Sequence, residues 1–319
     1  MNLWDRWKKR TSDHLNEEII PYTTEPASAF LFAPTARYAD LASAKMPQYL
    51  LSARPHSGLN RLTKMERLSG YLPGMSTINA NVINASVEVI GVRGSESVIE
   101  VQSQVDSASQ AQAQALLTQV TIEQKNSHLR LFSPPGRRAG HCLTQIAITC
   151  PSQRHVTIQG VYSAVRLTGL TEGVDVETTH GRITLLNLAA SVNAKVKEGI
   201  IDYSGHQGLV RLFAGWELNL NFTLPTFDGR MEAVAEGPVR VLLSAGFRGS
   251  LEANVAKGAV FVCRAALKTP MIRREEDGRV IHSFGEGIPN VRLMSIKGPL
   301  CLIMHRRGWK HDSSRVWLG

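Results

Sequence analysis

Three acidic residues recur at a nearly constant spacing in the middle of the chain. Glu177, Asp202 and Asp228 are 25 and 26 residues apart. If the chain coils with about three short strands per turn, residues at this spacing lie on adjacent turns and their carboxylates stack. Two neighbouring carboxylates can act as general acid and general base in glycoside cleavage. The other interpretation is three solvated strand positions, because Lys and Arg are equally frequent nearby and Glu177 differs from Asp202 in motif position. We expect no catalytic residue.

The ten histidines are dispersed along the chain. Metal-ligand residue types gather only at His141, Cys142, Cys150 and His155. Their spacing matches no zinc motif, and the segment has the pattern of strands. The chain also lacks a Walker-type phosphate loop and a Gly-x-Ser-x-Gly nucleophile turn. We therefore expect neither a metal nor a cofactor.

The four cysteines do not form a disulfide framework in a chain of 319 residues. Cys142 and Cys150 flank a predicted strand over 143–149, and a disulfide between them is one option. Cys263 and Cys301 fall within apolar strand patterns, so we expect both to be buried. A reducing compartment is the expectation that follows.

Cations and aromatic residues gather at both termini. Leu3 and Trp7 share one face of a predicted short helix over 2–18, which fits a membrane surface, a partner groove or the domain itself. The tail over 305–319 can pair with phosphate, dock on an acidic protein surface or stay solvated. The candidate contacts to a protein or nucleic acid are Trp4, Trp7, Lys8, Lys9, Arg10, Arg306, Arg307, Trp309 and Lys310.

The net charge of +9 is uneven. Residues 154–267 hold 11 Lys/Arg against 10 Asp/Glu, whereas 268–319 hold 10 against 5 and 1–153 hold 15 against 12. A nearly neutral centre does not suggest a surface built to grip nucleic acid, and it leaves the basic ends for acidic partners. No apolar run approaches the roughly 20 residues that span a bilayer, and the N-terminus lacks a secretory core. We expect an intracellular protein, either mitochondrial or cytoplasmic.

The centre of the chain repeats a five-residue motif: a small residue, then apolar residues at the third and fifth positions. The small residues at 173, 181, 190, 199 and 208 are spaced 8, 9, 9 and 9. Apolar residues two apart face one side of a strand, and the polar residues between them face the other. The motif runs as Gly181-Arg-Ile-Thr-Leu, Ala190-Ser-Val-Asn-Ala, Gly199-Ile-Ile-Asp-Tyr, Gly208-Leu-Val-Arg-Leu, Gly229-Arg-Met-Glu-Ala, Gly237-Pro-Val-Arg-Val, Gly249-Ser-Leu-Glu-Ala and Gly258-Ala-Val-Phe-Val.

Half-buried strands of this size cannot bury their apolar faces alone, so they must stack. An all-β solenoid stacks successive coils in parallel, and an antiparallel β-sandwich is the alternative. The constant phase of the motif relative to its glycine favours the solenoid. The scarcity of hairpin dipeptides also favours the solenoid. Between the predicted strands, Asp228-Gly229 and Asp277-Gly278 are the only Asn-Gly or Asp-Gly pairs.

The pattern divides the chain into three parts. Residues 1–78 form a largely irregular or disordered leader, 79–304 one β-domain and 305–319 the basic tail. Within the domain we expect irregular first strands over 79–153, the regular repeat over 154–263, a surface excursion over 269–290 and a closing strand over 298–304. The 21-residue step from Gly208 to Gly229 contains either an extra strand, 217–223, or a loop.

The glycine-anchored strands of 154–263, preceded by irregular strands, resemble the adhesin-like β-solenoid family, a domain of unknown function. The stretch GLTEGVDVETTHGRITLLNL, residues 169–188, carries the closest match. The resemblance covers roughly 80–304 and implies a right-handed β-helix. It implies no catalytic residue.

We therefore predict a non-catalytic β-solenoid that offers a strand face or a sheet edge to a protein partner. One alternative is a component of an organellar nucleoprotein assembly bound through the basic termini. The second is a carbohydrate-active β-helix enzyme.

Overall fold

The computed structural model describes residues 60–71, 77–107, 109–125, 128–132, 140–264, 271–285 and 287–304. Within these ranges the protein is all-β with one short helix, α3 (Gln110–Leu117). The strands are β1 (Asn60–Tyr71), β2 (Thr77–Ile83), β3 (Ala85–Val92), β4 (Glu96–Ser107), β5 (Thr121–Lys125), β6 (His128–Phe132), β7 (Gly140–Pro151), β8 (His155–Val161), β9 (Ser163–Thr168), β10 (Val174–Leu188), β11 (Val192–Gly205), β12 (Gln207–Ala214), β13 (Glu217–Phe222), β14 (Asp228–Ala235), β15 (Val239–Leu243), β16 (Leu251–Ala256), β17 (Phe261–Arg264), β18 (Ile272–Glu276), β19 (Arg279–Phe284), β20 (Val291–Ser295) and β21 (Leu300–Met304).

Alternation of apolar and polar side chains explains why these segments are strands. In β11, Val192, Ala194 and Val196 are buried, whereas Asn193 is exposed and Lys195 is half-buried. Successive side chains of a strand point to opposite faces, so this order gives one dry face and one wet face. The same alternation occurs in β8, β10, β13 and β14.

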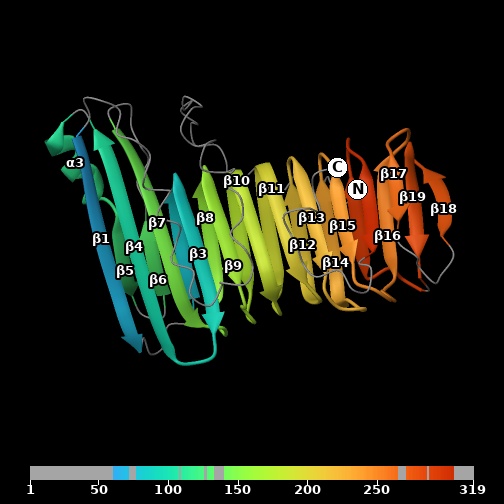
Figure 1. Ribbon diagram of the computed structural model, residues 1–319, viewed down its shortest axis with the longest axis horizontal. Coiled ribbons are helices and arrows are strands. Elements are labelled where there is room, and N and C mark those ends of the chain that lie inside the picture. Colours follow the sequence, from blue (N-terminus) through green and yellow to red (C-terminus); the bar gives the residue numbers. More distant parts are fainter. Residues whose placement is uncertain are drawn as a thin grey trace. The chain divides into compact units, whose positions relative to one another are not determined.

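The strands pair along two ladders, which β10 and β11 join into one 21-stranded sheet. The first ladder runs β1–β4–β7–β3–β9–β10–β11–β13–β15–β21–β17. The second runs β5–β6–β2–β8–β10–β11–β12–β14–β20–β16–β19–β18. The first parts of β10 and β11 belong to the second ladder and their last parts to the first. Figure 1 shows the strands side by side, with β1 at one end of the row and β18 at the other.

Parallel pairing in register stacks apolar residues on apolar residues. Ile183 lies opposite Val165 in one neighbouring strand and Ile201 in the other. Val174 lies opposite Val192 in the same way. All five side chains are buried, and they belong to one core cluster that both ladders share. The apolar positions of the sequence motif are therefore the core of the protein.

Antiparallel pairs occur among the described strands only in β1–β4–β7, β5–β6 and β16–β19–β18. Every described pair between β8 and β15 is parallel. The antiparallel sandwich alternative is therefore wrong. The physical reason is that the chain crosses to the other ladder before it returns, whereas a hairpin turns back beside itself.

Two strand pairs lie out of chain order. The pair β20–β21 lies between β14–β15 and β16–β17, although β16–β17 precedes it in the sequence. Similarly, β2–β3 lies between β6–β7 and β8–β9. Each end of the ladders is thus assembled from segments that are distant in the chain.

Three sequence expectations change. Residues 60–71, placed in the irregular leader, form β1, which pairs with β4 along its whole length. Its sequence lacks clear alternation, so its pairing could not be seen as periodicity. The surface excursion over 269–290 contains β18 and β19, and Val280, His282 and Phe284 are buried. The predicted closing strand, observed as β21, lies inside the first ladder rather than at its end. Of the two alternatives for the step from Gly208 to Gly229, a strand over 217–223 or a loop, the structure has the strand, β13.

Glycine at the small position of the motif allows close approach between neighbouring strands. A Cβ atom on Gly199 would lie 1.9 Å from the carbonyl oxygen of Gly181 and 2.7 Å from a methyl carbon of Val196. Only a residue without a side chain fits this position. The recurring small residues of the motif therefore serve stacking as well as turn formation.

Candidate interaction site

The predicted acidic residues do not come together. Glu177, in the second-ladder part of β10, pairs with Lys195, where Oε1 lies 2.7 Å from Nζ. Asp202 lies in the first-ladder part of β11, opposite Thr184. Its Oδ1 accepts a hydrogen bond of 3.0 Å from the Asn219 amide, and its other oxygen pairs with an arginine of β10. Glu177 and Asp202 therefore each bind polar side chains of a neighbouring strand, and they do so on different ladders.

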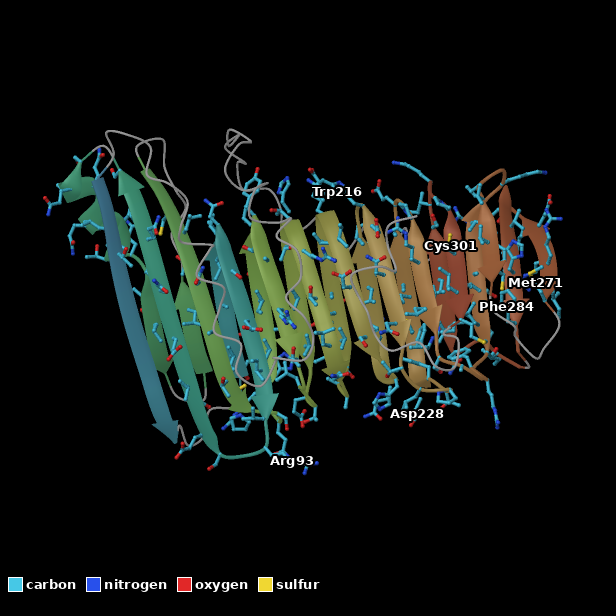
Figure 2. All side chains as sticks on the ribbon, in the orientation of Figure 1. Arg93, Trp216, Asp228, Met271, Phe284 and Cys301 are labelled. Carbon is cyan, nitrogen blue, oxygen red and sulfur yellow. The ribbon has the colours of Figure 1, made fainter. Side chains whose placement is uncertain are left out.

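The third acidic residue, Asp228, begins β14. In Figure 2 it lies at one end of the strands, whereas Trp216 lies at the other end. The stacking expected from the 25- and 26-residue spacing is therefore wrong. Val174 lies opposite Val192, so one step along a ladder takes 18 residues here. A shift of 25 residues moves a side chain onto the other ladder. The carboxylate arrangement that a glycosidase requires is not formed by these three residues.

The cysteine and histidine cluster is also dispersed. Among the residues described, no group of three or more His, Cys, Asp or Glu side chains could hold a metal ion. Cys142 and Cys150 are free, and they lie near opposite ends of the extended strand β7, about 26 Å apart at the usual rise per residue. The disulfide option is therefore wrong. Burial raises the pKa of the Cys142 thiol and raises that of Cys150 to about 12.

The other two cysteines differ from expectation, because Cys263 is exposed and Cys301 is half-buried. Cys263 lies in β17, the last described strand of the first ladder. Cys301 lies opposite Arg240, on the polar face of β21. Periodicity shows which face a residue shares, but it does not show where a ladder ends.

The nine candidate contact residues of the termini lie outside the described residues, as does the predicted helix over 2–18. Contact with a protein or nucleic acid through the termini stays a prediction. No helix in the described part of the chain is long and apolar enough to cross a membrane.

The structure reveals a candidate surface that the sequence did not predict, at the end of the ladders near β17. The second ladder extends past β17 by the hairpin β18–β19. Asp277 and Gly278 form its two-residue turn, with φ of 49° and 70°. Positive φ at both central residues is the type I′ geometry that joins twisted antiparallel strands, and Asp-Gly favours it.

Strand β18 is an edge strand that pairs, in the described part of the chain, with β19 alone. All five of its residues are exposed. The pair Glu276–Arg279 closes a two-residue turn and is therefore a hydrogen-bonded pair, and such pairs alternate along a hairpin. The backbone N–H and C=O groups of Arg273 and Glu275 consequently point to the open edge. They are positioned to pair with another strand.

Exposed apolar side chains accompany this edge. Met271 and Ile272 are 48% and 62% exposed at the start of β18, and Val260, just before β17, is 61% exposed. Figure 2 shows Met271 at the same end of the row of strands as Phe284, which is buried. Surface apolar residues beside an unpaired strand edge are typical of strand-addition sites.

Charged groups on β18 form a local network. Glu275 Oε1 accepts from Arg273 at 2.8 Å, and its other oxygen lies 3.1 Å from Lys257 Nζ. Lys257, and after it Arg273, lower the pKa of the Glu275 carboxyl. Arg274 pairs with Glu252 of β16 at 3.0 Å. Glu276 has no ion-pair partner among the described residues, which leaves its carboxylate available.

Packing across the core holds the hairpin in place. The His282 ring of β19 stacks on Phe261 of β17, with ring centroids 3.8 Å apart and 9° between the planes. Burial, followed by the charge of Arg273, lowers the pKa of His282. The Arg279 guanidinium donates to the Ser295 carbonyl oxygen at 2.6 Å. The edge strand is thus supported by a well-packed neighbour.

Sequence reasoning missed this site because charges dominate 269–290. The signal was present in Asp277-Gly278, a hairpin dipeptide followed by the apolar residues Val280 and Ile281.

No protein-family model matches the chain, and no curated protein shows significant sequence similarity to it. Solved structures give weak likenesses. A candidate cell adhesion protein from Clostridium sporogenes is 14% identical over 76% of this chain and 100% of that chain, with a TM-score of 0.32. A candidate adhesin from Bacteroides fragilis is 12% identical over 76% of this chain and 97% of its own, with a TM-score of 0.40. At these values the likeness assigns neither a family nor an activity, and the adhesin-like family stays a prediction.

Proposed function

We propose that this chain is a non-catalytic β-solenoid that binds a protein partner by strand addition at the open edge of β18. The observation that carries the proposal is an exposed edge strand whose N–H groups at Arg273 and Glu275 point away from its hairpin partner. Exposed Met271 and Ile272 adjoin it. Main-chain hydrogen bonds supply affinity in strand addition, and neighbouring side chains supply specificity.

The solenoid architecture is supported by the two parallel ladders. Both β10 and β11 pass from one ladder to the other within a single strand, and the strands from β12 to β15 alternate between the two ladders. Connections between parallel strands of one sheet are right-handed in nearly all proteins, which favours a right-handed coil. Such a scaffold presents extended edges and faces to a partner.

Arg273→Pro tests the proposal. Proline removes the outward N–H but leaves the hydrogen bonds between β18 and β19, and its φ suits an edge strand. Arg273→Ala is the matched control, because it removes the same side chain and keeps the N–H. We expect a partner captured from native extract by the wild type and by Arg273→Ala to be lost with Arg273→Pro. Equal capture by all three chains would contradict edge pairing.

Fractionation of the same extract gives the compartment. We propose an intracellular location, mitochondrial or cytoplasmic, because Cys142, Cys150, Cys263 and Cys301 form no disulfide, as in a reducing compartment. Recovery in the secreted fraction would contradict it.

A further inference from the structure

We propose that a second copy of this chain pairs with the β18 edge, strand β18 against strand β18, around a two-fold axis. The inference rests on the proposed function, because it uses the same edge, and it names the partner. The charge order along the strand and its turn supports it: Arg273 and Arg274 are followed by Glu275, Glu276 and Asp277. A basic half followed by an acidic half complements itself only when the two copies run antiparallel.

Symmetry restricts the register. Two antiparallel strands of one sheet are related by a two-fold axis perpendicular to the sheet, so opposite residues share a face. Residues on one face of a strand are separated by even numbers of positions. Two opposite residues must therefore both have even numbers or both have odd numbers, and the axis passes between two copies of the same residue. Centring the axis on Glu275 places Arg274 opposite Glu276 of the second copy. It also brings Arg273 beside the turn that Asp277 of the second copy begins.

Backbone hydrogen bonding agrees with this register. The residues whose N–H and C=O groups point outward are Arg273 and Glu275. In the centred register Glu275 forms a hydrogen-bonded pair with Glu275 of the second copy, and the outward groups of Arg273 face the turn that Asp277 begins. The outward groups of Glu275 in one copy therefore meet those of Glu275 in the other.

The register has one like-charge contact, between the two Glu275 side chains at the axis. Each of these carboxylates lies 3.1 Å from Lys257 Nζ and 2.8 Å from the Arg273 guanidinium of its own chain. These cations offset the repulsion. Glu276, which has no ion-pair partner among the described residues, gains Arg274 of the second copy. Opposite charges directly across antiparallel strands stabilise the pair, and like charges destabilise it.

The contact is small, since β18 has five residues. Small interfaces belong to weak, transient associations, so we expect a dimerisation Kd on the order of 10 to 100 μM. Charged residues on edge strands also serve to prevent pairing in other proteins. If the charges of β18 serve to prevent pairing, the protein will be monomeric at all concentrations.

Sedimentation velocity of the full chain, from about 1 to 200 μM, tests the proposal. Glu276→Arg places two arginines opposite each other, and we expect association at least about tenfold weaker. The double variant Arg274→Glu/Glu276→Arg exchanges the charges and restores association. Glu172→Arg, an exposed substitution with the same change in net charge and outside the edge, leaves association unchanged. Thermal melting checks that each variant is folded.

A monomer at every concentration would overturn the inference, and so would a dimer that Glu276→Arg and Arg273→Pro leave intact. A monomer whose capture of another protein still depends on the Arg273 N–H would leave the proposed function standing. The absence of both self-association and Arg273→Pro-sensitive capture would remove both. The two failures are therefore distinguishable.

Discussion

Leu300 of β21 lies directly opposite Val239 of β15, although 61 residues separate them in the chain. On its other side Leu300 lies opposite Phe261 of β17. The intervening pair β16–β17 is therefore attached to the rest of the protein through strands that come after it in the sequence. Folding of this end cannot proceed in chain order.

Leu300→Ala should destabilise the protein by about 2–5 kcal/mol, because the side chain is fully buried. Hydrogen exchange should show lost protection in β17 as well as β21, while β8 and β9 keep theirs. Val260→Ala, at an exposed site of the same end, should change stability by less than about 0.5 kcal/mol. If β17 kept its protection in the Leu300 variant, its attachment through β21 would be refuted.

Ser295→Ala should cost about 1–3 kcal/mol, because the buried Ser295 Oγ serves three backbone groups. It lies 2.8 Å from the Gly237 oxygen and 2.7 Å from the Gly298 oxygen, and it accepts from the Gly298 N–H at 3.1 Å. Ser244 is also buried, but its Oγ has no hydrogen-bond partner in the described part of the chain. Ser244→Ala should therefore be neutral or stabilising. Denaturant titration compares the two, and equal effects would contradict the role given to Ser295.

Gly199→Ala should destabilise the protein strongly, since the new methyl would lie 1.9 Å from the Gly181 carbonyl oxygen. The strands β10 and β11 would have to separate at this position. Gly246→Ala is the comparison, because its φ is 79° but no atom lies within 4 Å of the position that its Cβ would take. It should cost only the conformational strain, about 1 kcal/mol. Thermal melting ranks the two, and the reverse order would refute close stacking at Gly199.

Stability should fall as the pH drops below about 6.5, the usual pKa of an unfolded histidine. Burial holds the pKa of His282 below that value in the folded protein, so the unfolded chain binds the proton first. The loss continues until the pH passes the lowered folded pKa. His282→Phe keeps an aromatic ring against Phe261 and should flatten this part of the stability curve. Denaturant titrations between pH 5 and 8 measure it, and an unchanged slope would count against His282.

Thiol labelling should separate the cysteines. Burial raises the pKa of Cys142 and Cys150, so their thiolates are scarce and inaccessible in the folded protein. Exposed Cys263 should react with a disulfide reagent in seconds to minutes, while these two react only after unfolding. Native labelling followed by mass spectrometry gives the sites. Rapid native modification of Cys150 would contradict its burial.

Local spacing in the amino-acid sequence was enough to establish the β class, the face that each central strand buries and the places where small residues are required. Ile183 and Ile201 are core residues because apolar side chains two apart share one face, whatever the partner strand is. Gly199 holds the small position of the motif, where β11 passes from one ladder to the other. Strand type, the buried face and the small positions depend only on residues that are close together in the sequence, so a short segment determines them.

Which residues meet depended on the assembled chain. The 18-residue step from Val174 to Val192 placed Glu177 and Asp202 on different ladders, and the pairing of the hairpin β18–β19 with β16 made β18 the open edge. Backbone hydrogen bonds join strands without regard to side-chain type, so pairing order and the end of a ladder leave little trace in periodicity. They follow from the way the whole chain closes its core.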